Sequence, residues 1–246
     1  METVILCGGK GTRAYPHTLE VPKPLLEVAG QPVLGQVMAI YRAQGFDRFV
    51  LAAGYKHELV SEYAATCPGS VTVLDTGEDT NTGGRVAACR DAVSGTFFVT
   101  YADGLGDVDL HTLLAFHRSH GGAATLTTVP LRSQYGTIDV DGDGRVGRFR
   151  EKPAFPDHRI NAGYFVFEPR VFELWEGEDL EREVLPALAE QGELFAYPHA
   201  GFWRSMDTYK EALELSALAE GAHPPWMPSE GQPGTEGDVE PGLPAS

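Results

Sequence analysis

The sequence predicts an α/β fold with a mostly parallel central sheet flanked by helices. Its first half alternates short apolar runs with helical segments, the pattern of strands joined by crossover helices. Its second half holds further strand-like runs separated by turn residues, which predicts a small antiparallel extension. With 246 residues, 42% of them hydrophobic and 22% charged, the chain is long enough to bury a sizeable core.

The first half predicts four buried strands and three helices. Short apolar runs closed by a glycine or a polar residue are typical of strands covered on both faces, and they occupy residues 3–7, 49–53, 71–75 and 97–101. The segments between these strands predict helices over residues 32–44, 57–65 and 84–93, and Gly45 is a stop signal for the first of them. Ligands gather at the carboxyl ends of parallel strands, so we expect the site there.

The second half changes character at about residue 123. Strand-like runs lie at residues 124–129, 136–140, 145–150 and 164–167. The segment Asp141-Gly142-Asp143-Gly144 between two of them predicts a hairpin turn. A calcium-binding loop is the alternative, but such a loop needs a glutamate at its twelfth position, where this chain has Lys152.

The last 26 residues differ in composition from the rest. Residues 221–246 contain five glycines, six prolines and four acidic residues, and no lysine or arginine. Such a segment buries too little apolar surface to offset its ordering entropy, so we predict a disordered Gly/Pro-rich acidic tail. Residues 1–220 are expected to form a single domain.

Charge and cysteine content exclude several classes of protein. With 19 Lys and Arg against 35 Asp and Glu, the formal net charge is −16, which argues against holding nucleic acid or a membrane surface by bulk attraction. Three cysteines without metal-ligand spacing fit reduced thiols rather than a disulfide framework or a zinc site. No apolar stretch approaches 18 residues and no basic segment precedes the first apolar run, so we expect a cytoplasmic protein that acts on small molecules.

The segment Gly8-Gly9-Lys10-Gly11-Thr12-Arg13 directly follows the first predicted strand. Small residues at this place let the backbone approach an anion closely, with N–H groups free to donate hydrogen bonds. The segment is not a Walker loop, because no GxxxxG precedes Lys10 and no Lys-Ser/Thr pair follows. Taken alone, it could also be a tight strand-to-helix turn.

A second motif, Pro22-Lys23-Pro24, lies ten residues beyond Arg13. The two prolines favour an extended backbone and limit where the Lys23 ammonium can point. Together, the glycine loop and this motif resemble the signature that opens the chain of the sugar-1-phosphate nucleotidyltransferases. Segments at residues 76–85, 101–104, 151–153, 161–165 and 202–208 follow in the order of that family, so the resemblance covers residues 1 to about 226.

The resemblance implies a Rossmann-like nucleotidyltransferase fold, with nucleotide bound by residues 1–122 and sugar phosphate by residues 123–220. An oxygen of a sugar 1-phosphate would attack the α-phosphorus of a nucleoside triphosphate (NTP) and release pyrophosphate. Several segments are most similar to members that use CTP and glucose 1-phosphate, although this chain has only residues 64–71 where those members carry a longer insertion. The alternative is a sister enzyme that uses GTP or another NTP, with a different sugar or cyclitol 1-phosphate in secondary metabolism.

The resemblance also implies roles for the matching residues. Arg13 would pair with the departing phosphates and Lys23 would lie between the two reacting phosphates. Asp103 and Asp207 would hold Mg²⁺, although Asp207 also precedes a helical run and could cap it. Further nucleotide contacts are implied for Leu6, Gly8, Gly9, Gly11, Thr12, Tyr55, Thr82 and Gly83. Sugar-phosphate contacts are implied for Tyr135, Gly136, Glu151, Lys152, Asn161 and Gly163.

Alternatives also exist for the sugar contacts and for the activity, and the resemblance predicts the binding partners. Glu151 and Lys152 could instead be an exposed ion pair without a ligand. An inactive regulatory homologue is the remote alternative to an enzyme, and it would be expected to lose Lys23 or an acidic metal ligand, which this chain retains. The resemblance implies a homo-oligomer whose small-molecule partners are an NTP and a sugar 1-phosphate.

Overall fold

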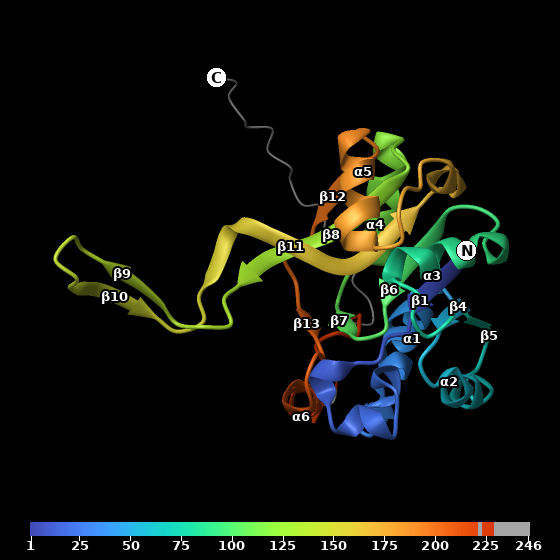
Figure 1. Cartoon of the computed structure of the whole chain (residues 1–246), viewed down its shortest axis with the longest axis horizontal. Coiled ribbons are helices and arrows are strands. Elements are labelled where there is room, and N and C mark those ends of the chain that lie inside the picture. Colours follow the sequence, from blue (N-terminus) through green and yellow to red (C-terminus); the bar gives the residue numbers. More distant parts are fainter. Residues whose placement is uncertain (221–222, 229–246) are drawn as a thin grey trace.

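The computed structural model describes residues 1–220 and 223–228, which are built around one seven-stranded sheet (Figure 1). The strand order is β12-β8-β11-β6-β1-β4-β5. The bounds are Glu2–Leu6 for β1, Arg48–Ala53 for β4, Ser70–Asp75 for β5, Phe97–Tyr101 for β6, Ala124–Arg132 for β8, Ala154–Phe167 for β11 and Leu194–Pro198 for β12. Only β11 runs antiparallel to its neighbours, so the predicted mostly parallel sheet is confirmed.

Helices cover both faces of this sheet. The α-helices are α1 (Val33–Ala43), α2 (His57–Ala64), α3 (Thr82–Ala88), α4 (Leu110–His120), α5 (Leu185–Glu190) and α6 (Tyr209–Leu218). The 3₁₀ turns are η1 (Thr12–Ala14), η2 (His17–Leu19), η3 (Lys23–Leu25), η4 (Arg90–Ala92) and η5 (Pro169–Glu173), and η6 (Leu180–Val184) is a π-helical turn. No helix in the described part of the chain is long and apolar enough to cross a membrane.

The alternation of side chains along β1 explains the two layers of helices. Successive residues of a strand point to opposite faces. Ile5 packs in a core cluster with apolar side chains of α1, α2, α4 and α6, whereas its neighbours Val4 and Leu6 pack with those of α3, α5 and η6. The apolar run that predicts β1 is therefore buried on both sides, as expected for a central parallel strand.

The four strands and three helices predicted for the first half occur in the predicted order, and the third helix differs in its bounds. Residues 84–93 do not form one helix, because α3 begins at Thr82 and η4 follows it as a separate turn. The Arg85 N–H donates to the Asn81 oxygen at 3.0 Å, so both glycines of the Thr-Gly-Gly-Arg segment lie in the first turn of α3. Glycine is a poor helix former, and the sequence pattern therefore places the start of this helix too late.

The second half differs most at β11, which extends far beyond the predicted residues 164–167. Pro156 and the polar residues 157–159 interrupt its apolar pattern, so periodicity identifies only its end. The pairing of β11 with β8 shifts register twice, between Phe155 and Arg159 and between Asn161 and Phe165. Such bulges let a long strand bend along its partner. The hydrophobic patterns of the sequence also fail to predict helix α4 in the first half and strand β12 in the second half.

The predicted antiparallel hairpin is confirmed as a two-stranded arm that projects from the body of the molecule (Figure 1). It pairs β9 (Thr137–Val140) with β10 (Val146–Arg150), and its tight turn is closed by a hydrogen bond from the Asp141 N–H to the Arg145 oxygen. Residues 135–152 are called the hairpin arm below. Two smaller antiparallel pairs join β2 (Glu27–Val28) to β3 (Gln31–Pro32) and β7 (Gly104–Gly106) to β13 (Trp203–Ser205).

Residues 223–228 depart from the disorder predicted for residues 221–246. Trp226 is fully buried, and its indole N–H donates to Gln36 Oε1 on α1 at 3.2 Å. One buried aromatic side chain thus fixes a segment whose average composition resembles a tail. Residues 221–222 and 229–246 lie outside the described residues.

Candidate active site

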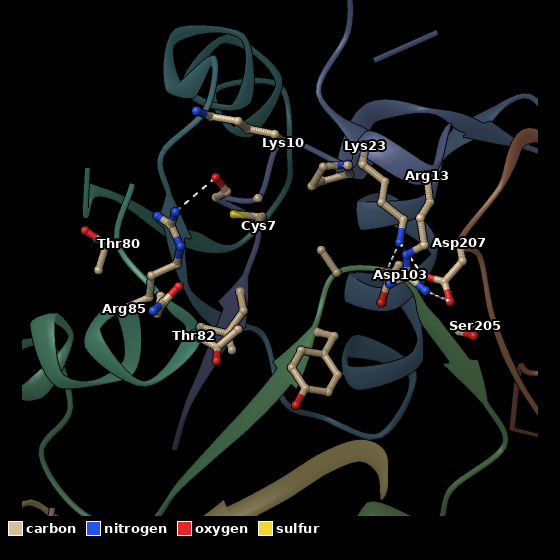
Figure 2. A pocket seen from close by; sticks show the side chains of 18 of the residues that line it. Cys7, Lys10, Arg13, Lys23, Thr80, Thr82, Arg85, Asp103, Ser205 and Asp207 are labelled. Atoms are coloured by element: carbon tan, nitrogen blue, oxygen red, sulfur yellow. Dashed lines mark hydrogen bonds and ion pairs between the residues drawn. The ribbon is translucent and has the colours of Figure 1, made fainter. Parts of the chain in front are cut away.

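A cavity of about 720 Å³ opens where β1 and β6 end (Figure 2). Its walls include residues 6–11, which lead from β1 through the glycine loop, and residues 101–103, which follow β6. Residues 78–82 enclose it on the side of α3. The cavity therefore lies at the carboxyl ends of parallel strands, where the sequence predicts the site.

Four charged side chains from distant parts of the sequence meet in this cavity. Lys23 Nζ lies 2.5 Å from Asp103 Oδ2 and 2.8 Å from Asp207 Oδ1, and Arg13 Nη1 lies 2.8 Å from Asp207 Oδ2 (Figure 2). We call Arg13, Lys23, Asp103 and Asp207 the Lys23 cluster. It joins the two motifs at the start of the chain to the ends of β6 and β13.

The surroundings of Lys23 keep it protonated. Its side chain is only 12% exposed, and burial alone would lower its pKa. The charges and hydrogen bonds of Asp103 and Asp207 outweigh burial, so the pKa of Lys23 is raised above its ordinary value. The extended backbone predicted around Lys23 is found only at Pro22, because Lys23 itself begins the 3₁₀ turn η3, in which Pro24 is tolerated near the start. This turn directs the Lys23 side chain towards the carboxylates.

The structure excludes one of the two roles considered for Asp207, that of the helix cap. The side chain that caps α6 belongs to Thr208, which accepts a hydrogen bond from the Glu211 N–H at 3.3 Å in a reciprocal capping box. The carboxylate of Asp207 is left to face Lys23 and Arg13 in the cavity. The capping alternative is therefore wrong for Asp207.

Gly11 brings the glycine loop against the Pro-Lys-Pro motif. Its φ angle is +61°, and a Cβ atom at this position would lie 2.6 Å from Lys23 Cβ. Only glycine tolerates both the left-handed backbone and this close approach at little cost. The two motifs that the sequence shows ten residues apart are thus packed against each other.

Arg85 fixes the other end of the glycine loop, a role that the sequence analysis missed. It is 4% exposed, and its guanidinium donates to the backbone oxygens of Gly8, Ala53, Gly77 and Glu78 and to Thr76 Oγ1, at 2.6–3.1 Å. Burial lowers the pKa of its guanidinium below the ordinary value. A Cβ atom on Gly8 would collide with this guanidinium at 2.1 Å, so the first glycine of the loop leaves room for Arg85.

Asp103 and Asp207 can also be judged as metal ligands. Both carboxylates already reach one point, the Lys23 ammonium. Among the described residues, no group of three or more His, Cys, Asp or Glu side chains could hold a metal ion. Two carboxylates without a complete protein cage fit Mg²⁺, which is often held by one or two carboxylates together with substrate phosphates and water.

Comparison with known proteins identifies the family. The profile described as nucleotidyl transferase matches residues 2–220. The chain belongs to the nucleotidyl transferase family. A probable glucose-1-phosphate cytidylyltransferase of Bacillus subtilis is 39% identical and is matched over 92% of this chain and 99% of that protein. The glucose-1-phosphate cytidylyltransferase of Salmonella typhi is 36% identical, with 92% and 98% covered.

This nucleotidyl transferase is also similar to a guanylyltransferase in sequence and to a solved structure in fold. The mannose-1-phosphate guanylyltransferase catalytic subunit beta of Danio rerio is 35% identical over 87% of this chain but only 63% of that protein. The crystal structure of HddC from Yersinia pseudotuberculosis has the same fold, with a TM-score of 0.71 at 21% identity over 89% of this chain and 99% of HddC. The predicted enzyme class, a sugar-1-phosphate nucleotidyltransferase, is confirmed.

Ten of the residues predicted for the site of this nucleotidyl transferase line the cavity. They are Leu6, Gly8, Gly9, Gly11, Arg13, Lys23, Thr82, Asp103, Asn161 and Asp207. Most of them belong to the nucleotide half, and they come together because β1 and β6 are adjacent in the sheet. Asn161 is the one predicted sugar contact among them.

The other predicted residues lie outside the cavity lining: Thr12, Tyr55, Gly83, Tyr135, Gly136, Glu151, Lys152 and Gly163. Tyr55 donates its hydroxyl to the Thr18 oxygen at 3.1 Å. Gly163 acts next to the lining, since its N–H donates to Asn161 Oδ1 at 2.8 Å. Four of these residues belong to the hairpin arm, where Tyr135 is 77% exposed. Their contacts with substrate stay predictions.

Several cavity residues escaped the sequence analysis. Besides Arg85, they include Lys10, Tyr101, Glu181 and Trp203. Lys10 lies at 2.8 Å from Glu78 on the exposed rim. Tyr101 ends the β6 run and could have been found from the rule that ligands meet strand ends. Glu181 lies about 80 residues further on in an unremarkable acidic stretch, and no motif identifies it.

Proposed function

We propose that this nucleotidyl transferase joins CTP and glucose 1-phosphate to give CDP-glucose and pyrophosphate. The observation that carries the reaction is the meeting of the Lys23 cluster beside the glycine loop in one cavity. The choice of CTP and glucose 1-phosphate is supported by the two cytidylyltransferases, which match 92% of this chain over 98–99% of their own length.

In the proposed reaction, an oxygen of the sugar phosphate attacks the α-phosphorus. The bond from this phosphorus to the oxygen that bridges it to the β-phosphate breaks, and the electron pair leaves with pyrophosphate. The protein holds the two phosphates in line and neutralises the charge on their oxygens. It needs no covalent intermediate, and buried Cys7 is not suited to supply one, since burial raises its thiol pKa to about 12.

Lys23 and Arg13 are assigned different tasks in this reaction. Two carboxylates engage the Lys23 ammonium, which leaves its third N–H for a phosphate oxygen between the reacting groups. Arg13 is 70% exposed at its side chain and presents a planar fork of donors, which suits the departing pyrophosphate. Both cations stabilise charge that grows as the phosphorus–oxygen bond breaks.

We further propose that Asp103 and Asp207 hold Mg²⁺ together with the phosphates. When bound, the ion would polarise the phosphoryl oxygens and neutralise part of their charge. The carboxylates would orient it next to the nucleotide. A protein with a net charge of −16 thus reaches a polyanionic substrate through local cations rather than through its overall field.

The hairpin arm is proposed to complete the sugar side and to support a homo-oligomer. Its side chains of Ile138, Val140, Val146 and Phe149 are each more than half exposed. An isolated hairpin is marginally stable in water, and this arm gains a partner if it packs on a second copy. Replacing Ile138 and Phe149 by serine should lower the oligomeric state in sedimentation velocity, and an unchanged state would contradict this assignment.

The decisive experiment tests four NTPs against several sugar 1-phosphates, with pyrophosphate release as the readout. We expect release to be fastest with CTP and glucose 1-phosphate. Release with GTP and mannose 1-phosphate instead would support the second candidate, which rests on the identity to the guanylyltransferase. No release with any pair would contradict the proposed reaction.

A further inference from the structure

Glu181 contributes a carboxylate to the cavity outside the Lys23 cluster. It is the second residue of the π-helical turn η6, and it lines the cavity together with Thr82, Tyr101 and Asn161. Short π-helical turns are rare and are frequently found at functional sites. This carboxylate is not needed to bind phosphate, which it would repel, so its place in a cavity for polyanions calls for another ligand.

The turn that carries Glu181 is held in place by its own side chains. Asp179 accepts hydrogen bonds from the N–H groups of Glu181 and Arg182 at 3.1 and 2.9 Å. Glu183 accepts from the N–H groups of Glu178 and Asp179 at 2.7 and 2.9 Å. The carboxylates of Asp179 and Glu183 thus accept hydrogen bonds from the backbone N–H groups at the start of the turn. The Glu181 carboxylate is not needed there and lines the cavity instead.

The Glu181 carboxylate ends a chain of hydrogen bonds that crosses the cavity wall. Thr82 Oγ1 donates to one carboxylate oxygen at 2.7 Å, and the Tyr101 hydroxyl donates to the other. The Asn161 amide donates to the Tyr101 hydroxyl at 3.3 Å. Burial, followed by the nearby charge of Glu181, raises the pKa of Tyr101, so its hydroxyl keeps the proton that it donates.

This chain leaves Glu181 with unused acceptor capacity. An ionised carboxylate can accept about four hydrogen bonds, and the two donors just named use one on each oxygen. Thr82 and Tyr101 hold both oxygens in fixed positions while the side chain stays exposed to the cavity. Two fixed, parallel acceptor sites are suited to a pair of neighbouring hydroxyl groups.

We propose that Glu181 binds a vicinal diol of a substrate and selects against substrates that lack it. This proposal rests on the proposed function, because both proposed substrates carry vicinal hydroxyls, the NTP on its ribose and the sugar 1-phosphate on its ring. Glu181 joins the wall that contains Thr82, predicted for the nucleotide, to the wall that contains Asn161, predicted for the sugar. Either source presents the same chemistry.

The test compares hydroxylated substrates with deoxy analogues in the wild type and in Glu181→Gln. Glutamine keeps one acceptor oxygen and the size of the side chain but removes the charge. Steady-state rates are measured with CTP, 2′-deoxy-CTP and 3′-deoxy-CTP, and separately with glucose 1-phosphate and its monodeoxy analogues. We expect KM for the complete diol to rise about 10- to 100-fold in the variant, the range of a charged hydrogen bond, with kcat changed less.

The substrates for which Glu181→Gln loses its preference show whether Glu181 binds the ribose or the sugar. If the ribose is bound, the preference for CTP over its deoxy analogues disappears and the preference among sugars stays; if the sugar is bound, the reverse holds. Glu183→Gln is the matched control, since it weakens the same turn without facing the cavity, and it should affect hydroxylated and deoxy substrates equally. Equal losses in Glu181→Gln, or no change, would overturn the proposal.

Failure of this proposal is distinct from failure of the proposed function. An active wild type with unchanged diol preference in Glu181→Gln refutes only the role of Glu181. A wild type that releases no pyrophosphate with any substrate pair refutes the reaction itself. Thermal unfolding of both variants separates a loss of binding from a loss of folding.

Discussion

The Lys23 cluster and the hairpin arm carry the two halves of the predicted site, and the fold assembles them to very different degrees. In the cluster, three ion pairs of 2.5–2.8 Å join residues from four parts of the chain, and the Lys23 side chain is 12% exposed. In the arm, Tyr135 and Phe149 are 77% and 63% exposed and lie outside the cavity lining.

The Lys23 cluster is organised by contacts within one subunit, whereas the hairpin arm has few such contacts. Groups that stabilise charge work best when they are fixed before the reaction, and the cluster is fixed by opposite charges within the chain. The arm has a defined hairpin but little packing to hold it, so the sugar-binding role proposed for it would require movement towards the cavity or a second copy. The comparison predicts large effects of mutation in the cluster and smaller ones in the arm.

Lys23→Ala is expected to have the largest effect. Removing one charge-stabilising contact typically lowers the rate about 10²–10³-fold, and here it also leaves Asp103 and Asp207 without their shared cation. Pyrophosphate release measures the loss, and circular dichroism should show an intact fold. Lys210→Ala, which removes an exposed lysine that pairs with Glu214 away from the cavity lining, is the control. Near-normal turnover of folded Lys23→Ala would exclude a pre-assembled catalytic cluster.

Arg85→Lys should produce the next largest effect, mainly on stability. A lysine cannot replace the five hydrogen bonds of the buried guanidinium, so backbone oxygens beside the glycine loop lose their donors. We expect the free energy of unfolding in urea to fall by about 2–4 kcal/mol. Exposed Arg118→Lys serves as the comparison and should change it by less than about 0.5 kcal/mol. An equally small change in Arg85→Lys would mean that the loop is held by other contacts.

Most residues predicted for the nucleotide half line one cavity, and there is a physical reason why the sequence can bring them together. Gly11 has a left-handed backbone, and prolines constrain the backbone on both sides of Lys23. Such local requirements leave short motifs that can be recognised without knowing the fold. The strands β1 and β6 are parallel neighbours, so their carboxyl ends lie at the same edge of the sheet. This arrangement brings the glycine loop after β1 close to Asp103 after β6. These two facts account for Arg13, Lys23 and Asp103, whereas Asp207 joins the Lys23 cluster from the end of β13.

The parts that the sequence does not predict depend on contacts between distant segments. In the sequence, Arg85 looks like any arginine in a helix. Only the fold shows that backbone oxygens of distant segments surround its guanidinium. Trp226 lies in a segment of tail-like composition, yet one contact with Gln36 and the core fixes it. The position of the hairpin arm depends on the bulged strand β11, whose register shifts have no signature in the apolar pattern.

Variants of the arm are expected to change sugar binding by a smaller factor. Glu151→Gln and Lys152→Ala should each raise KM for glucose 1-phosphate about 10-fold, the effect of one charged hydrogen bond, while KM for CTP stays within twofold. Asp143→Asn, at the tip of the same arm, controls for effects on the hairpin itself. If Glu151 and Lys152 are only exposed side chains without a ligand, all three variants will behave like the wild type.

The pH dependence of stability is the smallest effect and tests whether the cluster is fixed before substrate binds. Because Asp103 and Asp207 raise the pKa of Lys23 in the folded protein, its protonated form stabilises the fold fully below its ordinary pKa of 10.5. This contribution is lost as the pH rises above 10.5 through the folded pKa. The difference in unfolding free energy between wild type and Lys23→Met should therefore shrink over that range, by at most about 1.4 kcal/mol per pH unit. Urea denaturation at pH 8 to about 11.5 measures it, with Lys210→Met as the control. A difference that stays constant with pH would show that the ion pairs of Lys23 add nothing to the folded state, and the contrast with the hairpin arm would then rest on burial alone.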